Sequence, residues 1–218
     1  MGDSRSPPFL FFVFANGRQR GQRDGKELRT RLSIPQGVEY RILNYRFAEQ
    51  IFDSHEFSNI RWEIFDIVKR APAISRSKAR GKITTDQDAI NGWFDKEFGA
   101  RQWEVKPYVT DKKITELRAD FKKQRVQVEV QFGNAARAIY DIFKMQISYS
   151  LGLIDVGVLI LPMKDFSKTM GDNIAHFERV ARELPYAKMS ITLPILIIGI
   201  APKVPQTRKS RKRAKVGQ

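Results

Sequence analysis

The amino-acid sequence predicts an α/β protein in which a mixed central β-sheet is flanked by helices. The first observation is the order of elements in the second half of the chain, which reads hairpin, helix, strand, helix, strand and is typical of a helix-covered sheet. The second is a pair of short, almost wholly apolar runs at 156–161 and 193–200, typical of central strands buried on both faces. The third is composition, because 42% of the 218 residues are hydrophobic, enough for one packed domain.

The first half of the chain is expected to add one strand and two helices to this core. Residues 37–43 alternate between apolar and polar side chains and predict a strand. Apolar residues recur at helical spacing over 55–70 and predict an amphipathic helix. Thr85 and Asp88 form a pattern similar to a capping box, which predicts the start of a second helix that continues to about Phe98.

The second half gives clearer elements. Residues 117–121 and 126–132 flank the polar stretch 122–125 and predict a β-hairpin. One helix is predicted from about Asn134 and another over about 173–184. The apolar side of the first of these helices is expected to carry Ala138, Ile139, Ile142, Phe143 and Ile147.

Positive charge is concentrated at the two ends of the chain. Residues 1–32 carry seven Lys or Arg against three Asp or Glu, and residues 203–218 carry seven with no acid, which leaves +4 of the total +15 for residues 33–202. We therefore divide the chain into a basic N-terminal arm or extension (1–32), a folded domain (33–202) and a basic flexible tail (203–218). This distribution suits contact with the phosphates of a polyanion and favours a nucleic-acid partner; a tail that only aids solubility is the alternative.

Composition also argues against several classes of protein. The chain has no cysteine, so a disulfide framework, a zinc–thiolate site and a cysteine nucleophile are excluded, and a reducing cytoplasm fits best. The apolar run at 9–14 is six residues long, too short to span a membrane. His55 and His176 are too few and too far apart to indicate a histidine-based zinc nuclease.

The strand over 126–131 carries the strongest candidate for chemistry. Its valines fall on one face, while Glu129 and Gln131 point to the other, about 7 Å apart along the strand. Asp120 precedes Glu129 by nine residues and can come close to it across the hairpin. Two converging carboxylates can hold Mg²⁺ through oxygen ligands. The pattern alone is equally compatible with an ordinary hairpin that has one solvated face, which is the more common case.

Several uncommon strings resemble a known family of enzymes. These are Val128-Glu129-Val130-Gln131-Phe132 with Asp120 before it, and the stretches 154–158 (IDVGV), 160–164 (ILPMK) and 198–202 (IGIAP). In the same order, they resemble the BglII/BstYI family of type II restriction endonucleases, a variant group of the PD-(D/E)xK nucleases. The similarity is strong over about 120–202, faint over about 37–110 and absent from the first 30 residues.

The resemblance implies a restriction-endonuclease-like core and a Mg²⁺ site. Asp120 and Glu129 match the family's metal-binding carboxylates. Gln131 stands where most PD-(D/E)xK nucleases have lysine, so a metal-bound water positioned by Gln131 and the substrate phosphate is expected to attack. The family's fourth active-site position falls within 103–106, where the resemblance is too loose to assign a residue.

The resemblance also points to residues that read DNA. Asn134 matches a base-contacting asparagine of the family, and asparagine is suited to bidentate contact with adenine; a plain helix N-cap is an equally good explanation. Asp172 and Asn173 lie in a loop that matches a segment involved in reading the outer base pair. Asp172 departs from the small hydroxyl residue expected there.

Basic segments are expected to contact the phosphate backbone, which sets register and affinity without reading sequence. The first lies at 76–82 and the second at 208–215. The residues that we assign to DNA binding in the first segment are Lys78, Arg80 and Lys82. Lys164 and Lys168 could contact phosphates in the same way or simply be solvated.

The resemblance implies a homodimer acting on double-stranded DNA, because a twofold-symmetric site asks for a twofold-symmetric protein. The expected site is RGATCY or AGATCT, cut 5′ of GATC to leave a four-base 5′ overhang, with a protective DNA methyltransferase in the host. Two alternatives stay open: a repair or junction nuclease of the same fold, and a non-catalytic basic protein that binds nucleic acid.

Overall fold

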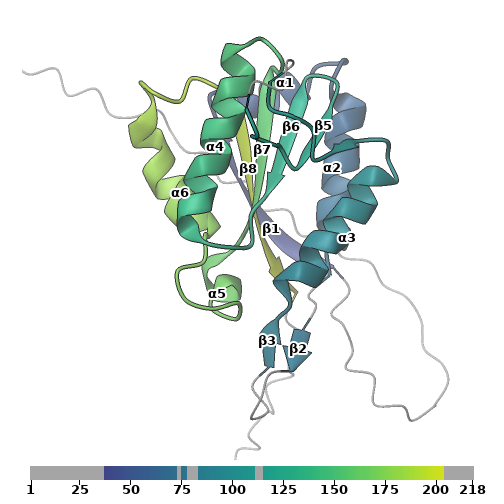
Figure 1. Cartoon of the computed structure of the whole chain (residues 1–218), viewed down its shortest axis with the longest axis vertical. Helices are drawn as coiled ribbons and strands as arrows, with labels where there is room; N and C mark the ends of the chain where they lie inside the picture. The colour runs from purple at the N-terminus through teal and green to yellow at the C-terminus, as the bar shows by residue number, and fades with distance from the viewer. Residues whose placement is uncertain (1–36, 73–74, 78–82, 111–114, 204–218) are drawn as a thin grey trace, which may run out of the picture.

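The computed structural model describes residues 37–72, 75–77, 83–110 and 115–203. A six-stranded sheet runs through the molecule in the order β1-β8-β7-β6-β5-β4 (Figure 1). Strands β6, β7 and β8 are parallel, and the remaining pairings are antiparallel, so the sheet is mixed, as predicted. The strands are β1 (Val38–Tyr45), β4 (Glu104–Val105), β5 (Phe121–Lys123), β6 (Val126–Val130), β7 (Val156–Pro162) and β8 (Ile195–Pro202).

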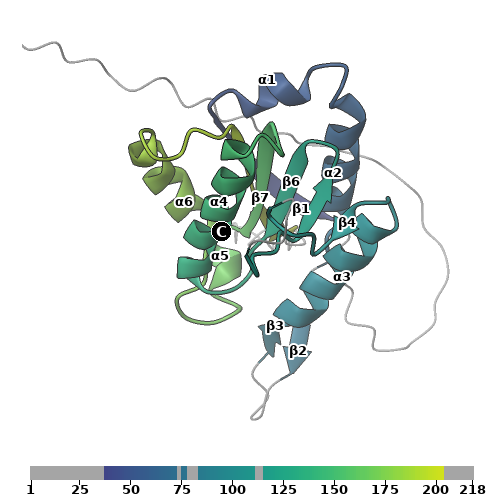
Figure 2. The same ribbon diagram turned by 45° about the horizontal axis from the view of Figure 1, so that its top comes forward.

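Helices cover both faces of the sheet (Figures 1 and 2). One face packs against α1 (Ala48–Phe52), α2 (Ser58–Arg70) and α3 (Gln87–Gly99), whose apolar side chains form one buried cluster with the sheet. The other face packs against α4 (Ala135–Ser150), α6 (Phe177–Glu183) and the 3-10 turn η2 (Leu184–Ala187) in a second cluster. The short α5 (Lys164–Ser167) follows β7, and a two-stranded ribbon, β2 (Ser75–Ser77) with β3 (Ile83–Thr85), projects from the body (Figure 1).

The two apolar runs form the centre of the sheet, which confirms both strand predictions. Every residue of β7 is buried, because its neighbours β6 and β8 pair on both edges and helices cover both faces. Val158 and Ile160 belong to the cluster under α2 and α3, whereas Leu159 and Leu161 belong to the cluster under α4 and α6. This alternation is the period of two that a strand imposes on its side chains.

Several predicted boundaries are wrong. The strand expected to end near residue 43 continues to Tyr45. The cap of α3 is Asp86, whose side chain accepts from the Ala89 N–H at 3.1 Å; Thr85 instead ends β3, with its hydroxyl 2.5 Å from that of Thr169. The helix expected over 173–184 begins only at Phe177. The chain before Phe177 is extended and lies alongside the start of α4, where Ile174 forms a β-bridge with Asn134.

The hairpin between β5 and β6 is tighter than predicted. Lys123 pairs directly with Val126, so the turn has two residues rather than four. Gln124 takes a left-handed conformation with φ of 50°, as the first position of a two-residue hairpin turn requires. Arg125 reaches Asp155 with two hydrogen bonds of 2.5 and 2.6 Å, which holds the turn against the segment that precedes β7.

The side of α4 that faces the sheet is also different from the prediction. Ala138 and Ile142 are buried, but Ile139 and Phe143 are 60% and 52% exposed. Polar residues of α4 take the covered positions instead, because the strand face opposite them is polar.

No helix among the described residues is long and apolar enough to cross a membrane.

Candidate active site

The register of the hairpin brings Asp120 and Glu129 together. Phe121 pairs with Val128, so the next residues outward, Asp120 and Glu129, stand opposite each other. The Oδ2 atom of Asp120 accepts a hydrogen bond of 2.9 Å from the Val130 backbone N–H, which fixes the carboxylate beside β6. The convergence of these two acidic side chains follows from the short turn and from the pairing of β5 with β6.

The polar face of β6 is buried rather than solvated. Gln127, Glu129 and Gln131 are 1%, 0% and 9% exposed, so the explanation as an ordinary hairpin with one wet face is wrong. Burying three polar side chains is costly unless each finds a partner. Helix α4 supplies them at matching intervals: Gln127 with Ser148 at 2.7 Å, Glu129 with Lys144 at 2.7 Å, and Gln131 with Asp141 at 2.9 Å.

Burial and neighbouring charges shift the ionisation of this layer. Burial raises the pKa of Glu129 to about 8, the negative charge of Asp120 adds to the rise, and the positive charge of Lys144 opposes it. Burial lowers the pKa of Lys144, but the adjacent carboxylates of Glu129 and Asp141 outweigh burial and raise it overall. Lys144 therefore stays positively charged. Perturbed carboxylates in a cavity are a frequent mark of an active site.

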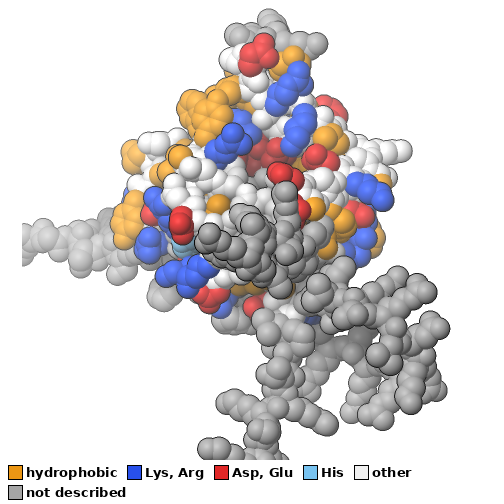
Figure 3. All heavy atoms as spheres, turned by 60° about the horizontal axis from the view of Figure 1, so that its bottom comes forward, with side chains coloured by type: hydrophobic (Ala, Val, Ile, Leu, Met, Phe, Trp, Pro, Cys, Tyr) orange, Lys and Arg blue, Asp and Glu red, His pale blue; other side chains and the backbone are white. Residues whose placement is uncertain are grey.

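A cavity of about 440 Å³ opens beside these residues, between α3, α4 and the hairpin. It combines two kinds of charge, with carboxylates next to basic side chains. On the face seen in Figure 3, acidic side chains lie in a hollow with Lys and Arg side chains beside them. The charged residues that line the cavity are Asp95, Glu116, Asp120, Asp141, Lys106, Arg118, Arg137 and Lys144.

The cavity also contains residues that sequence reasoning did not assign. Lys106, in the stretch where the fourth position was expected, places its Nζ 2.7 Å from Asp120 Oδ1 and 3.7 Å from Asp95 Oδ1. Trp103, from the same stretch, is buried elsewhere against Glu63. Asn91 and Asp95 line the cavity from α3; their spacing of four residues places them on one helix face, a signal that the sequence contained.

Two of the expected DNA-reading segments lie side by side. Asn134 caps α4, with its Oδ1 accepting from the Ala136 N–H at 2.8 Å, so the N-cap explanation is confirmed. Asn134 forms a β-bridge with Ile174, and the Asn173 carbonyl accepts from the Ala135 N–H at 2.9 Å. Exposed Asp172 therefore stands next to the start of α4. The three basic residues Lys78, Arg80 and Lys82 lie outside the described residues.

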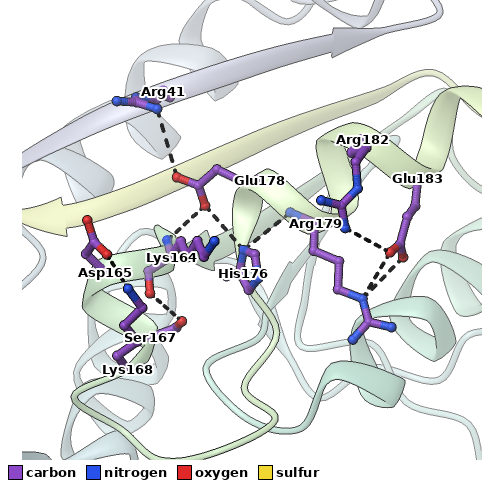
Figure 4. Close-up of polar contacts among 10 residues, drawn as sticks. All are labelled: Arg41, Lys164, Asp165, Ser167, Lys168, His176, Glu178, Arg179, Arg182 and Glu183. Atoms are coloured by element: carbon purple, nitrogen blue, oxygen red, sulfur yellow. Dashed lines mark hydrogen bonds and ion pairs between the residues drawn. The ribbon is translucent and has the colours of Figure 1, made fainter.

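The segment from α5 to α6 is held by Glu178 (Figure 4). Its Oε2 accepts from the Lys164 backbone N–H at 2.8 Å and lies 3.3 Å from His176 Nδ1. Lys168 makes an ion pair with Asp165 at 2.8 Å, and the Lys164 side chain is exposed. His176 thus has a structural role in this contact, as expected for a histidine outside the chemistry.

Comparisons with known proteins agree with this geometry. The family model for restriction endonuclease BglII/BglIII matches residues 40–200. The crystal structure of restriction endonuclease BglII complexed with a DNA 16-mer aligns at a TM-score of 0.62 and 17% identity, covering 74% of this chain and 75% of that one. The crystal structure of free BglII gives 0.60 and 17%, covering 78% and 82%. No curated protein matches the chain.

The two kinds of comparison carry different weight. At this level of identity the solved structures establish the fold alone, a PD-(D/E)xK-type core with a mixed six-stranded sheet. The family model spans most of the chain, from within β1 to within β8, and it decides against a non-catalytic protein and against a repair nuclease. The chain belongs to the restriction endonuclease BglII/BglIII family, and is a type II site-specific deoxyribonuclease.

Proposed function

We propose that this enzyme cuts both strands of duplex DNA at a palindromic GATC-centred site by Mg²⁺-dependent hydrolysis and leaves 5′-GATC overhangs. The observation that carries the proposal is the convergence of Asp120 with buried Glu129, beside a cavity that Asp120 lines together with basic side chains. Carboxylates there suit a divalent cation, and the basic groups suit a phosphate.

Asp120 and Glu129 are the residues that would hold Mg²⁺. Both offer the hard oxygen atoms that this ion prefers, and each carboxylate oxygen keeps acceptor capacity beyond the single hydrogen bond that it makes to the protein. Two carboxylates fill only part of the coordination shell of Mg²⁺, so the remaining positions suit waters and a phosphate oxygen. When bound, the ion polarises the scissile phosphate and lowers the pKa of water.

Gln131 is suited to hold the attacking water in line. Its amide is fixed at both ends, because Nε2 donates to Asp141 at 2.9 Å and Oε1 accepts from the Gly133 N–H at 2.8 Å. One N–H and one lone pair remain for the water. Lys106 and Arg137 line the cavity from exposed positions and are suited to contact the phosphate.

We assign recognition of bases to Asn134 and to the loop that carries Asp172 and Asn173. The hydrogen bonds between this loop and the start of α4 support a single reading surface, although the two segments are almost forty residues apart in sequence. The Oδ1 of Asn134 is used as a cap, so its amide N–H groups are the ones suited to contact a base acceptor. The site RGATCY or AGATCT follows from the family resemblance, and Asp172 would accept from a cytosine amino group.

We also propose that the enzyme acts as a homodimer. Ile139, Tyr140 and Phe143 form an exposed apolar strip on α4, the helix that also supplies Lys144 and Asp141 to the site. Such a strip supports contact with a second copy, and two copies related by a twofold axis match a palindrome. We also propose that the enzyme works in a bacterial or archaeal cytoplasm. A protective methyltransferase in the host is proposed as well, since the enzyme would otherwise cut host DNA.

Cleavage of short duplexes tests the proposal. We expect a duplex with AGATCT to be cut in Mg²⁺ and left intact in EDTA, and a matched duplex with a scrambled centre to stay intact in both. If both duplexes are cut equally, the proposed specificity is wrong. If folded protein in Mg²⁺ cuts neither of these duplexes, nor GATC-centred duplexes with other outer base pairs, the proposed GATC recognition site is wrong.

A further inference from the structure

Lys144 is the one buried lysine among the residues that the structure describes. It projects from the middle of α4, and its side chain is 9% exposed. Its ammonium group contacts three oxygen atoms: Glu129 Oε2 at 2.7 Å, Asp141 Oδ1 at 3.0 Å and the Arg118 carbonyl at 3.0 Å. An ammonium has three N–H donors, so the protein itself uses all of them.

This set of oxygen atoms resembles the surroundings of a metal ion. Two carboxylates and one backbone carbonyl are the ligand types that Mg²⁺ and Ca²⁺ take in proteins. All three oxygens lie within 3.0 Å of one nitrogen. The ammonium of Lys144 therefore occupies a cradle in which a divalent cation could otherwise sit.

Lys106, the other lysine of the cavity, is arranged differently. Its side chain is 49% exposed, and its Nζ contacts Asp120 at 2.7 Å, which leaves N–H donors for a substrate. Lys144 has none to spare. The two lysines therefore differ in role: Lys106 faces the cavity with N–H donors left for a substrate, whereas all three N–H donors of Lys144 are bound inside the protein.

We propose that Lys144 is a built-in cation of the active site. It balances the negative charge of Asp141, and that of Glu129 once this carboxyl group has lost its proton. It also holds Glu129 in place and confines the divalent cation to the Asp120 side of Glu129. Lys144 is thus a positioning residue that acts through Glu129. The strand has glutamine rather than lysine at position 131, so α4 supplies the positive charge of this layer. The inference rests on the proposed function only in taking Glu129 as a metal ligand.

The test replaces the charge and measures Ca²⁺ binding by the full chain without DNA. Lys144→Gln removes the charge and keeps a hydrogen-bond donor, and Lys144→Met removes both. The matched control is Lys123→Met, because Lys123 contacts both oxygens of Glu63 at 2.8 and 2.9 Å and the Arg101 carbonyl at 2.8 Å. Neither Lys123 nor Glu63 lines the cavity. Calorimetric titration gives affinity and stoichiometry, and thermal melting in EDTA and in Ca²⁺ gives the stabilisation.

We expect wild-type protein to bind one Ca²⁺ per chain. Both Lys144 variants should bind Ca²⁺ at least about tenfold more tightly, since a cation beside the site is removed, and should gain more in melting temperature from Ca²⁺ than wild type. Lys123→Met should melt lower yet respond to Ca²⁺ as wild type does. A Lys144 variant whose Ca²⁺ response equals that of Lys123→Met would overturn the inference.

Asp141→Asn keeps the inference testable if the Lys144 variants do not fold. It retains Lys144 and the shape of the side chain but leaves excess positive charge in the cradle, so Ca²⁺ binding should weaken about tenfold; an unchanged affinity would contradict the inference. The proposed function can fail separately. Ca²⁺ binding without any DNA cleavage would count against the proposed function, whereas cleavage together with unresponsive Lys144 variants would count against the role of Lys144.

Discussion

At the scale of single residues, the site depends on carboxylates that the fold buries and pairs. Asp120 approaches β6 through a hydrogen bond to a backbone N–H, and Glu129 is enclosed between Gln127 and Lys144. We expect Glu129→Ala to abolish cutting of a cognate duplex in Mg²⁺ while binding of that duplex in Ca²⁺ survives, because the substitution removes a proposed metal ligand and leaves the reading surface. Single-turnover cleavage and gel-shift assays measure the two properties. Cutting at the wild-type rate would show that the site is misassigned.

Gly133 offers a way to disturb Gln131 without changing it. A Cβ atom at Gly133 would lie 2.9 Å from Gln131 Oε1, which would displace the amide from its present hydrogen bonds. We expect Gly133→Ala to slow single-turnover cleavage by about 10- to 100-fold, the usual cost of disturbing a group that orients an active site. Gly92→Ala is the matched control, since a Cβ there meets nothing within 4 Å; it should cut normally and gain about 0.5–1 kcal/mol of stability. Equal rates for the two variants would count against a role for Gln131.

The raised pKa of Glu129 has a consequence for stability in the absence of metal. The folded protein holds the proton of Glu129 up to about pH 8, whereas the unfolded chain releases it near the ordinary value of 4.5. Between these values the folded state binds more protons, so the contribution of Glu129 to the free energy of unfolding falls as pH rises. Glu129→Gln lacks this dependence. Urea denaturation in EDTA should show the variant gaining on wild type from about pH 5 to pH 8; parallel curves would contradict the assignment.

At the scale of elements, the sequence predicted which side chains share one face of a strand better than it predicted which element covers that face. The alternation of Val and polar residues over 126–131 correctly placed Glu129 and Gln131 on one side. It could not reveal that this side is buried, because the covering partners lie on α4 at Asp141, Lys144 and Ser148. For the same reason Ile139 and Phe143 were misplaced, since the polar strand, and not the apolarity of the helix, decides which side of α4 turns inward.

The local sequence pattern also could not predict the register of the hairpin. A four-residue turn was predicted because Lys122 and Lys123 are polar, yet both belong to β5. The edge strand β4 and the contact of Lys123 with Glu63 accommodate these lysines, and neither feature can be read from the local pattern. The hairpin itself was predicted, and with it the approach of Asp120 to Glu129, which the pairing of Phe121 with Val128 confirms. The metal-binding role that the family resemblance gives these two residues stays a prediction.

Packing between α6 and the sheet gives a prediction for an element far from the chemistry. A Cβ atom at Gly199 of β8 would lie 2.5 Å from a ring carbon of Phe177, and both residues are in the core beneath α6. We expect Gly199→Ala to lower the free energy of unfolding by about 1–3 kcal/mol, the usual cost of overpacking, and to leave cleavage at low temperature unchanged. A variant as stable as wild type in urea would show that α6 shifts freely.

At the scale of the whole molecule, the proposed dimer and the proposed recognition site depend on each other. Phe143 is 52% exposed on α4 and contacts the Tyr140 ring. We expect Phe143→Glu to shift the protein from dimer to monomer in sedimentation velocity and to abolish double-strand cutting. Trp62→Glu is the control, because Trp62 is 67% exposed on α2; that variant should remain a dimer. A dimeric Phe143→Glu variant would place the interface elsewhere.

The division into a basic arm, a domain and a basic tail stays a prediction, because residues 1–36 and 204–218 lie outside the described residues. The family match over 40–200 lies within the proposed domain of 33–202. If the arm has no catalytic role, a chain that lacks residues 1–30 should fold and cut at the wild-type rate.

The most direct test of the account is digestion of unmethylated phage DNA with Mg²⁺, with EDTA and Glu129→Ala as controls, followed by run-off sequencing of the ends. We predict discrete fragments whose ends carry 5′-GATC overhangs, with the flanking base identifying the outer pair, and no fragments in either control. Fragments with other overhangs, random degradation, or cutting that persists in Glu129→Ala would contradict it.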